Sequence, residues 1–421
     1  MKRINILLTA LALIFATSCE SFLDVKPSNQ VDSGSSIQNV SDAKIMVQGL
    51  MNKLTSSNYY GRNFLIYGDA KGGDLTIYSA GNGGDAWYYF THEQSSNSYI
   101  GYWSTMYNCL LQANNIIKNI YSLKEGGATG LDDYLGQALT IRALIHFDLV
   151  RLYGKPYNMD KNAYGVPVVT EPIDASAQLL RNTVEEVYTQ VVKDLKDAAP
   201  LLGKKANNGF INYYANQAIL SKVYMYMDNF SEALTVAEGI INSGVYTPYT
   251  ASNWTASWAR TFGSESIFEL NVLVNEGDLG TGSPGCYYRR RAHGISAGGV
   301  FLASQYWFDI MGANDARWGI MDSDQSDEDD DPLAIFSTPT YYQVEEQLVL
   351  IACLMLLEQR YRLLQSMSPS EVVDEIETIM DSLYDAQLNN SLAHTTPENI
   401  TPFAFSWYYY GTSHISNPAY Q

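Results

Sequence analysis

The sequence predicts a mostly α-helical protein, in which tetratricopeptide-like helix pairs stack into a right-handed superhelical scaffold that carries a loop-rich, irregular ligand-binding part. Apolar residues recur at helical spacing from about residue 41 to residue 243. Within that region, residues 213–243 have the spacing of a tetratricopeptide repeat. After Tyr249, short apolar pieces alternate with Gly-rich stretches, which is typical of loops with a few strands.

The N-terminus has the pattern of an export signal. Two basic residues precede an apolar run from Ile6 to Ala16, and small residues lead to Cys19. The run is shorter than the roughly 18 apolar residues that a membrane-spanning helix needs. Lipoprotein peptidases cut before a lipid-carrying cysteine, so we expect residues 1–18 to be removed and Cys19 to be acylated. Because Ala16 stands where a lipobox usually has Leu, an ordinary secretory peptide and an uncleaved anchor remain as alternatives.

Composition narrows the function classes. The 421-residue chain has 45 acidic and 26 basic residues, a net charge of −19, and removal of Lys2 and Arg3 would make it −21. Such a chain repels nucleic acid and anionic lipid surfaces. Its 32 Tyr outnumber 14 Phe and 7 Trp, and Tyr suits surfaces that meet polar ligands, although most Tyr should line helix contacts.

Cysteines and histidines give no sign of a cofactor. Besides Cys19, the chain has Cys109, Cys286 and Cys353, an odd number without short spacing, and its five histidines are scattered. These patterns argue against a dense disulfide framework, a CxxC site and a zinc site. We therefore expect buried free thiols and no cofactor.

Four regions follow one another along the chain. A polar tether is expected at 19–40, and a helical region at 41–250 contains a long ordered loop excursion at 61–98. A loop-rich region at 251–421 completes the order. The expected helices start at Ser41, a candidate N-cap, and then cover 102–121, 134–153, 183–202 and the pair 213–243. In the last region we expect a strand-like segment at Ser266–Val274 and a late helix pair at about 343–366 and 369–388.

The pair at 213–243 carries the repeat pattern most clearly. Leu220, Ser221, Tyr224 and Ala233 occupy the register of the close-packed positions of a tetratricopeptide repeat. Small residues at 221 and 233 allow the two helices to approach each other. Since one repeat cannot bury its apolar face alone, neighbouring helix pairs must stack on it.

Several motifs, in order, resemble the SusD/RagB family of outer-membrane glycan-binding lipoproteins. They begin with CESFLDVKP after the signal and continue with YGDAKGGD, WSTMY followed by QANNII, QALTIRALIHFDLVRLYGKPY and GVPVVTEP. The resemblance covers roughly residues 19–318. After about residue 331 it is weak, because the late Arg- and Glu-rich motif of the family is missing and LVLIACLMLLEQRYRLLQ matches poorly.

The resemblance implies a surface-exposed outer-membrane lipoprotein that captures oligosaccharide or polysaccharide nutrient. It would pass the glycan to a SusC-like TonB-dependent transporter, without catalysis. The alternative is a lid or scaffold subunit of a transporter that imports peptide or another non-glycan nutrient. Catalysis has little support, because the sequence contains no nucleophile elbow, metal box or phosphate loop.

The first candidate binding segment runs from Asn82 to Phe90. A protein binds a sugar by stacking an aromatic ring on its apolar face and aiming polar groups at its hydroxyls. The segment and its surroundings supply such side chains: Arg62, Asn82, Asp85, Trp87, Tyr88 and Tyr89. The family resemblance also implies ligand contacts in this excursion. Alternatively, one or two of the three aromatic residues fill the core beneath the loop.

A second candidate is the segment Gly285–Arg291, where Tyr287 and Tyr288 could stack on a sugar while Arg289 donates hydrogen bonds. The alternative is that these arginines serve ion pairs. Nearby Trp307 has helical spacing and is expected in the core. The acidic run at 322–331 suggests calcium, but it lacks the Gly and the distal Glu of an EF-hand, so a solvated loop is the better interpretation.

Overall fold

The computed structural model describes most of residues 37–304 and a few positions beyond. The described ranges are 37–73, 75–77, 85–91, 100–174, 176–206, 209–258, 262–272, 284–288, 300–304 and 347–350, with single residues 260, 307, 315 and 318. This part of the chain is mostly helical, which confirms the predicted fold class. Within it, no helix is both long and apolar enough to cross a membrane.

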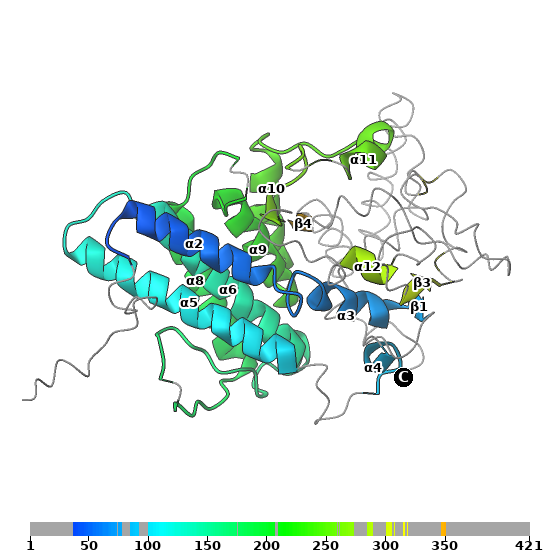
Figure 1. Ribbon diagram of the computed structural model, residues 1–421, viewed down its shortest axis with the longest axis horizontal. Coiled ribbons are helices and arrows are strands. Elements are labelled where there is room, and N and C mark those ends of the chain that lie inside the picture. The colour runs from blue at the N-terminus through cyan, green and yellow to red at the C-terminus, as the bar shows by residue number, and fades with distance from the viewer. Residues whose placement is uncertain are drawn as a thin grey trace, which may run out of the picture.

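The long helices lie together in one bundle (Figure 1). They are α2 (Val40–Leu54), α5 (Ile100–Glu125), α6 (Asp132–Tyr153), α8 (Val184–Ala198), α9 (Tyr213–Tyr226) and α10 (Phe230–Ile241). Helix α6 packs against α5 and α8, α8 packs against α9, and α9 packs against α10. Sequence neighbours are thus also neighbours in space, as stacked helix pairs require.

Helix α8 shows how local sequence sets an element. Its N-cap Thr183 accepts a hydrogen bond from the Glu186 amide, and the Glu186 carboxylate accepts one from the Thr183 amide, which together form a capping box. The buried residues then recur every three or four positions: Val184, Val187, Val191, Leu195 and Ala198. A short 3-10 turn, η3 (Ala199–Leu201), ends the helix.

The α9–α10 pair confirms the predicted close approach. The Ser221 hydroxyl donates to the Ala233 carbonyl at 2.8 Å, and both residues are buried. The connection turns at Asp228, whose φ of +57° lies in the left-handed region. Aspartate tolerates this conformation better than most residues, so a short connection suffices.

Smaller elements lie beside the bundle (Figure 1). They are α3 (Asn63–Gly72), β1 (Leu75–Ile77), α4 (Asp85–Tyr88), α7 (Tyr157–Asp160), α11 (Ala251–Ser257), β2 (Phe268–Asn271), α12 (Pro284–Tyr288), β3 (Phe301–Ala303) and β4 (Gln347–Leu350). Strand β1 pairs antiparallel with β3, with Thr76 opposite Leu302. Strand β2, inside the predicted segment Ser266–Val274, pairs antiparallel with β4, with Leu270 opposite Leu348.

Three details of the predicted elements were wrong. The first helix is capped by Asn39, whose side chain accepts from the amides of Ser41 and Asp42, so it begins before Ser41. The 61–98 excursion contains α3, β1 and α4, because burial of Phe64 and its neighbours outweighs the weak helix propensity of a Gly-containing segment. Residues 347–350 form a strand instead of part of a helix; the rest of the late helix pair lies outside the described residues.

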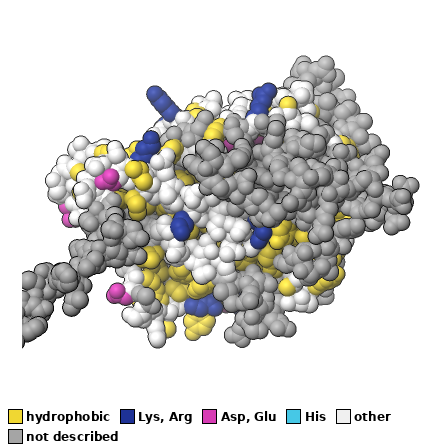
Figure 2. Space-filling view, in the orientation of Figure 1, with side chains coloured by type: hydrophobic (Ala, Val, Ile, Leu, Met, Phe, Trp, Pro, Cys, Tyr) yellow, Lys and Arg dark blue, Asp and Glu magenta, His cyan; other side chains and the backbone are white. Residues whose placement is uncertain are grey.

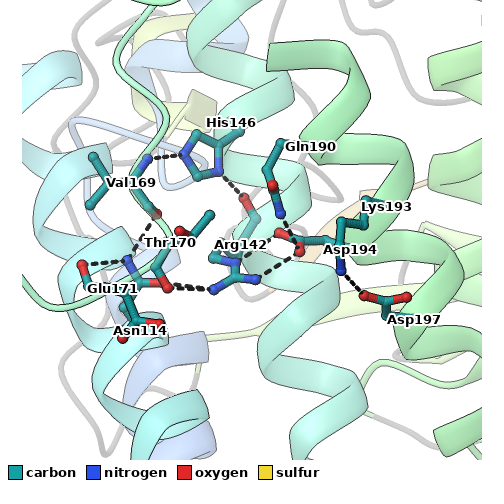
Figure 3. A network of polar contacts seen from close by, with 10 residues as sticks. All are labelled: Asn114, Arg142, His146, Val169, Thr170, Glu171, Gln190, Lys193, Asp194 and Asp197. Carbon is teal, nitrogen blue, oxygen red and sulfur yellow. Dashed lines mark hydrogen bonds and ion pairs between the residues drawn. The ribbon is translucent and has the colours of Figure 1, made fainter. Parts of the chain in front are cut away.

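A buried polar network joins α6, α8 and the loop after residue 165 (Figure 3). The His146 ring accepts a hydrogen bond at Nε2 from the Val169 amide, 3.1 Å away, so the proton resides on Nδ1 and faces the Arg142 carbonyl. Burial lowers the pKa of His146 to about 4, with the nearby Arg142 charge acting in the same direction. Histidine is therefore neutral here at neutral pH and serves as a structural link.

Candidate ligand-binding site

The start of α3 is tied to the bundle through one buried carboxylate. The hydroxyls of Tyr59 and Tyr60 both donate to Oδ2 of Asp148 on α6, at 2.5 and 2.6 Å. The Arg151 guanidinium pairs with the other oxygen of Asp148. Burial, and then the Asp148 charge, raise the pKa of both tyrosines well above its usual value, so they stay protonated and donate. The bundle thus fixes where α3 begins.

Helix α3 contacts both α12 and α4, which lie on different sides of it (Figure 1). On the α12 side, the Tyr288 hydroxyl donates to Asp69 Oδ2 at 2.6 Å, and the Arg62 guanidinium carbon lies 4.6 Å from the centre of the Tyr287 ring. Lys71 follows Asp69 by two residues, which is about 200° around a helix. Its side chain therefore leaves the other side of α3.

Trp87 of α4 is a core residue. Its side chain is 3% exposed, its ring stacks on Tyr102 at 6.3 Å, and it meets the edge of Tyr67 at 6.0 Å. The Tyr102 hydroxyl in turn donates to the Asn63 carbonyl at 2.9 Å. Trp87 fills the space between α3 and α5, so the expectation that it stacks on a sugar is corrected: its faces are covered by protein.

Beside Trp87, a pocket of about 410 Å³ opens between α3, α4 and β1. Its lining combines rings with polar side chains: Ala70, Lys71, Gly73, Leu75, Thr76, Tyr88, Phe90 and Ser304. The Tyr88 hydroxyl lies 3.4 Å from the Thr76 hydroxyl. Figure 2 shows hydrophobic side chains gathered at the surface over this region. Concave sites with apolar walls and a few polar groups are typical of small-ligand sites.

Phe90 at the pocket edge has an unusual backbone. Its φ is +55°, in the left-handed region that non-glycine residues rarely occupy, and its side chain is 48% exposed. Such a conformation costs about 1–3 kcal/mol and is often found at functional sites. The turn thereby keeps the ring of Phe90 at the surface instead of in the core.

The structure places the remaining candidate residues in different environments. Tyr89 is 55% exposed and meets the edge of Tyr88 at 5.1 Å, so it lies next to the pocket. Arg62 and Tyr287 are brought together, but on the opposite side of α3, and Tyr288 is buried against Asp69. The prediction that Trp307 is a core residue is confirmed by its 1% exposure.

Other predictions fall on positions that the structure does not describe. Asp85 begins α4, but only its backbone is described. Cys19, Asn82, Arg289 and the acidic run 322–331 lie outside the described residues. Cys109 is a buried free thiol, as expected. Its pKa is raised to about 11 by burial, which keeps it an unreactive thiol.

Comparison with known proteins agrees with this architecture. A SusD-like family model, described as "Starch-binding associating with outer membrane", matches residues 21–225. A SusD superfamily protein from Bacteroides thetaiotaomicron has the same fold, with a TM-score of 0.72, 27% identity and coverage of 82% of this chain and 80% of its own. This chain belongs to the SusD-like family.

Two further comparisons show how far the similarity extends. A SusD-like protein from Bacteroides ovatus is 24% identical over 57% of this SusD-like chain, and the match covers 42% of the relative. The chain thus spans less than half the length of that curated relative. A SusD-like carbohydrate binding protein from Bacteroides vulgatus has a TM-score of 0.67 at 18% identity, covering 90% and 82% of the two chains, which shows the shared fold.

Sequence reasoning missed part of the pocket of this SusD-like protein. Lys71, Thr76 and Ser304 were not among the candidates, although all three line the pocket. Lys71 lies in the YGDAKGGD motif, where a cation between glycines was an available signal. Ser304 comes from a distant segment, and only the pairing of β1 with β3, in which its neighbour Ala303 lies opposite Leu75, brings it to the pocket.

Proposed function

We propose that this SusD-like chain binds oligosaccharide, without cleaving it, in the pocket between α3, α4 and β1. The observation that carries the proposal is that the half-buried ring of Tyr88 and the exposed ring of Phe90 line one pocket with the hydroxyls of Thr76 and Ser304. A ring can cover the apolar face of a sugar while hydroxyls bond to its edge. The family description names starch binding, and the Bacteroides vulgatus structure is of a carbohydrate binding protein.

The expected affinity is modest. The pocket is open and offers few polar groups, so stacking contributes a few kcal/mol at most. We expect dissociation constants from micromolar to millimolar, about −8 to −4 kcal/mol. Such weak capture suits a protein that must release its ligand to another component.

The test is calorimetric titration of a panel of oligosaccharides against the protein and its Tyr88→Ala and Phe90→Ala variants. We expect each variant to lose about tenfold or more in affinity, because each removes a stacking surface. Tyr121→Ala is a matched control, since Tyr121 is an exposed tyrosine on α5, away from the pocket. Unchanged affinity in both pocket variants would remove this pocket from the binding site. Release of shorter products would contradict the non-catalytic role.

We further propose that the protein is held to the outer membrane by lipid on Cys19, facing the cell exterior, and delivers its glycan to a SusC-like TonB-dependent transporter. The family description, association with the outer membrane, supports the location. Substitution of Cys19 by Ser should move the protein from the membrane fraction to the soluble fraction. Retention of that variant in the membrane would contradict anchoring through this cysteine.

An exposed apolar strip supports docking on a partner. The segment between α6 and α8 exposes several large side chains: Met159, Tyr164, Ile173, Leu179 and Leu180. Hydrophobic side chains gather at the lower edge of Figure 2, where Figure 1 shows this segment. Contiguous exposed apolar surface is characteristic of protein interfaces. Leu180, 89% exposed, is the most exposed of them.

Co-purification with the transporter tests whether the strip is the docking surface. Leu180→Asp should weaken capture of the transporter and leave glycan affinity unchanged. Ile241→Asp on α10 is the control, because Ile241 is also exposed but lies away from the strip. If the transporter is captured and no glycan on a broad panel binds, the alternative role as lid or scaffold for a peptide or other nutrient is favoured.

A further inference from the structure

The pocket contains a cation whose charge is not neutralised by a described neighbour. Among the described residues, no carboxylate lies within the 4.0 Å ion-pair distance of the Lys71 ammonium. By contrast, four other lysines each pair with a carboxylate: Lys124, Lys155, Lys161 and Lys193. The described lining of the pocket also includes no acidic side chain.

Aromatic groups hold this ammonium in position. Its Nζ donates to the Tyr67 hydroxyl at 2.7 Å and lies 4.4 Å from the centre of the Tyr67 ring and 5.2 Å from that of Phe90. Cation–π contact orients the charge without neutralising it. An ammonium has three N–H groups, so the hydrogen bond to Tyr67 leaves two that can donate to a ligand.

We propose that the pocket binds an acidic sugar unit, with a carboxylate or sulfate oxygen accepting hydrogen bonds from Lys71 while Tyr88 and Phe90 contact the ring. This rests on the proposed glycan-binding function and adds the charge class of the ligand. A neutral sugar would leave the half-buried ammonium with less hydration and no counter-charge, whereas an anionic group compensates it.

The acidic character of the whole chain does not prevent an acidic sugar from binding in the pocket. The net charge of −19 would repel an anion at long range, but salt at physiological strength screens charges beyond about 8 Å. Within that distance, the Lys71 charge acts directly on a bound group. Among the described residues that line the pocket, Lys71 is the one charged side chain, so the local field in the pocket favours an anion.

The test uses matched pairs of oligosaccharides that differ only in charge. Oligogalacturonate is compared with its methyl ester, and a sulfated carrageenan oligosaccharide is compared with its desulfated form, by calorimetric titration of the full chain. We expect one acidic member to bind about tenfold tighter than its neutral partner, with affinity that falls as salt rises. The pair that shows this preference distinguishes carboxylate from sulfate.

Variants assign the effect to one side chain. Lys71→Met should abolish the preference for the acidic form, and Lys71→Arg should retain most of it. Lys53→Met is the matched control, because Lys53 occupies the last turn of α2 as Lys71 does in α3, away from the pocket. Asp74 lies outside the described residues, and the Asp74→Asn variant tests whether its carboxylate neutralises Lys71.

Each other result overturns the inference. Equal affinity for charged and neutral forms, unchanged in Lys71→Met, means that the proposed function stands but the charge class is wrong. A preference for acid that appears only in Asp74→Asn means that Asp74 neutralises Lys71 in the native protein. Absence of binding to any glycan, charged or neutral, overturns both this inference and the proposed function.

Discussion

The guanidinium of Arg142 forms a two-pronged pair with the carboxylate of Asp194, with Nε to Oδ2 and Nη2 to Oδ1 both at 2.7 Å (Figure 3). Both side chains are buried, and the pair ties α6 to α8. Gln190 also donates to Asp194, at 2.7 Å. Burial raises the pKa of the Asp194 carboxyl, while Arg142 favours its charged form and opposes that rise.

Breaking this pair should be costly. Arg142→Met leaves the Asp194 carboxylate buried without its counter-charge, so we expect a loss of about 3–5 kcal/mol in the free energy of unfolding. Urea denaturation followed by circular dichroism measures it. The matched control is Asp197→Asn, which breaks the solvent-exposed pair with Lys193 and should cost about 0.5 kcal/mol or less.

Removing both charges should cost less than the separate changes together. In the double variant Arg142→Met/Asp194→Leu no unpaired charge stays buried, so the two destabilisations should not add. Additive losses would show that the two side chains act independently, contrary to their geometry.

His146 should make stability depend on pH. The pKa of His146 is about 4 in the folded protein, against 6.5 ordinarily, so between these values the unfolded chain binds a proton that the folded chain does not. The His146 contribution to stability is therefore present above pH 6.5 and is lost as pH falls toward 4. The full loss is about 3 kcal/mol.

The measurement is the free energy of unfolding at several pH values, for the protein and for His146→Gln, which keeps an acceptor for the Val169 amide. The difference between the two should change by about 3 kcal/mol between pH 7 and pH 4. Parallel curves would show that His146 titrates normally in the folded protein.

Trp87 and Tyr88 are adjacent in sequence but should respond differently to substitution. Trp87→Ala should lower stability by about 3–5 kcal/mol, because it empties a buried site against Tyr102. Tyr88→Ala should cost much less stability and should weaken glycan binding, because Tyr88 lines the pocket. Thermal unfolding and titration together separate the two effects. A large loss of stability in Tyr88→Ala with normal binding would reverse their assignment.

The crossing of α9 and α10 should tolerate only small side chains at position 221. Ser221→Ala removes the hydrogen bond to the Ala233 carbonyl and should cost about 1 kcal/mol. Ser221→Leu must also force the helices apart, so a cost of about 3 kcal/mol or more is expected. The midpoint of urea denaturation measures both, and equal midpoints would contradict close packing at this crossing.

Helices whose apolar stripe continues over several turns were predictable from the sequence, but short elements were not. The α8 segment carries its own start signal in Thr183 and Glu186 and its own apolar stripe, so local sequence suffices. Helix α3 has neither: its N-cap Arg62 makes no side-chain capping bond, and its segment contains two glycines. It is helical because Tyr59 and Tyr60 join its start, and Tyr288 joins its side, to other elements.

The binding site was predictable in kind and only partly in its residues. An aromatic and polar segment at 82–90 does border the pocket, through Tyr88 and Phe90. Adjacent aromatic residues look alike in a sequence, however, and nothing local shows that Trp87 turns inward while Tyr89 turns outward. That choice depends on Tyr67 and Tyr102, which lie against Trp87 only after α3 and α5 have packed.

By itself, the sequence determined the helical class, the close crossing at Ser221 and Ala233, and the family to which the motifs belong, because each depends on residue spacing along one segment. The tertiary structure decided which aromatic residues are buried and which line a pocket. It also separated Arg62 from Lys71 by placing them on opposite sides of α3. Spacing along a chain predicts which side chains share a face, but only packing decides what that face meets.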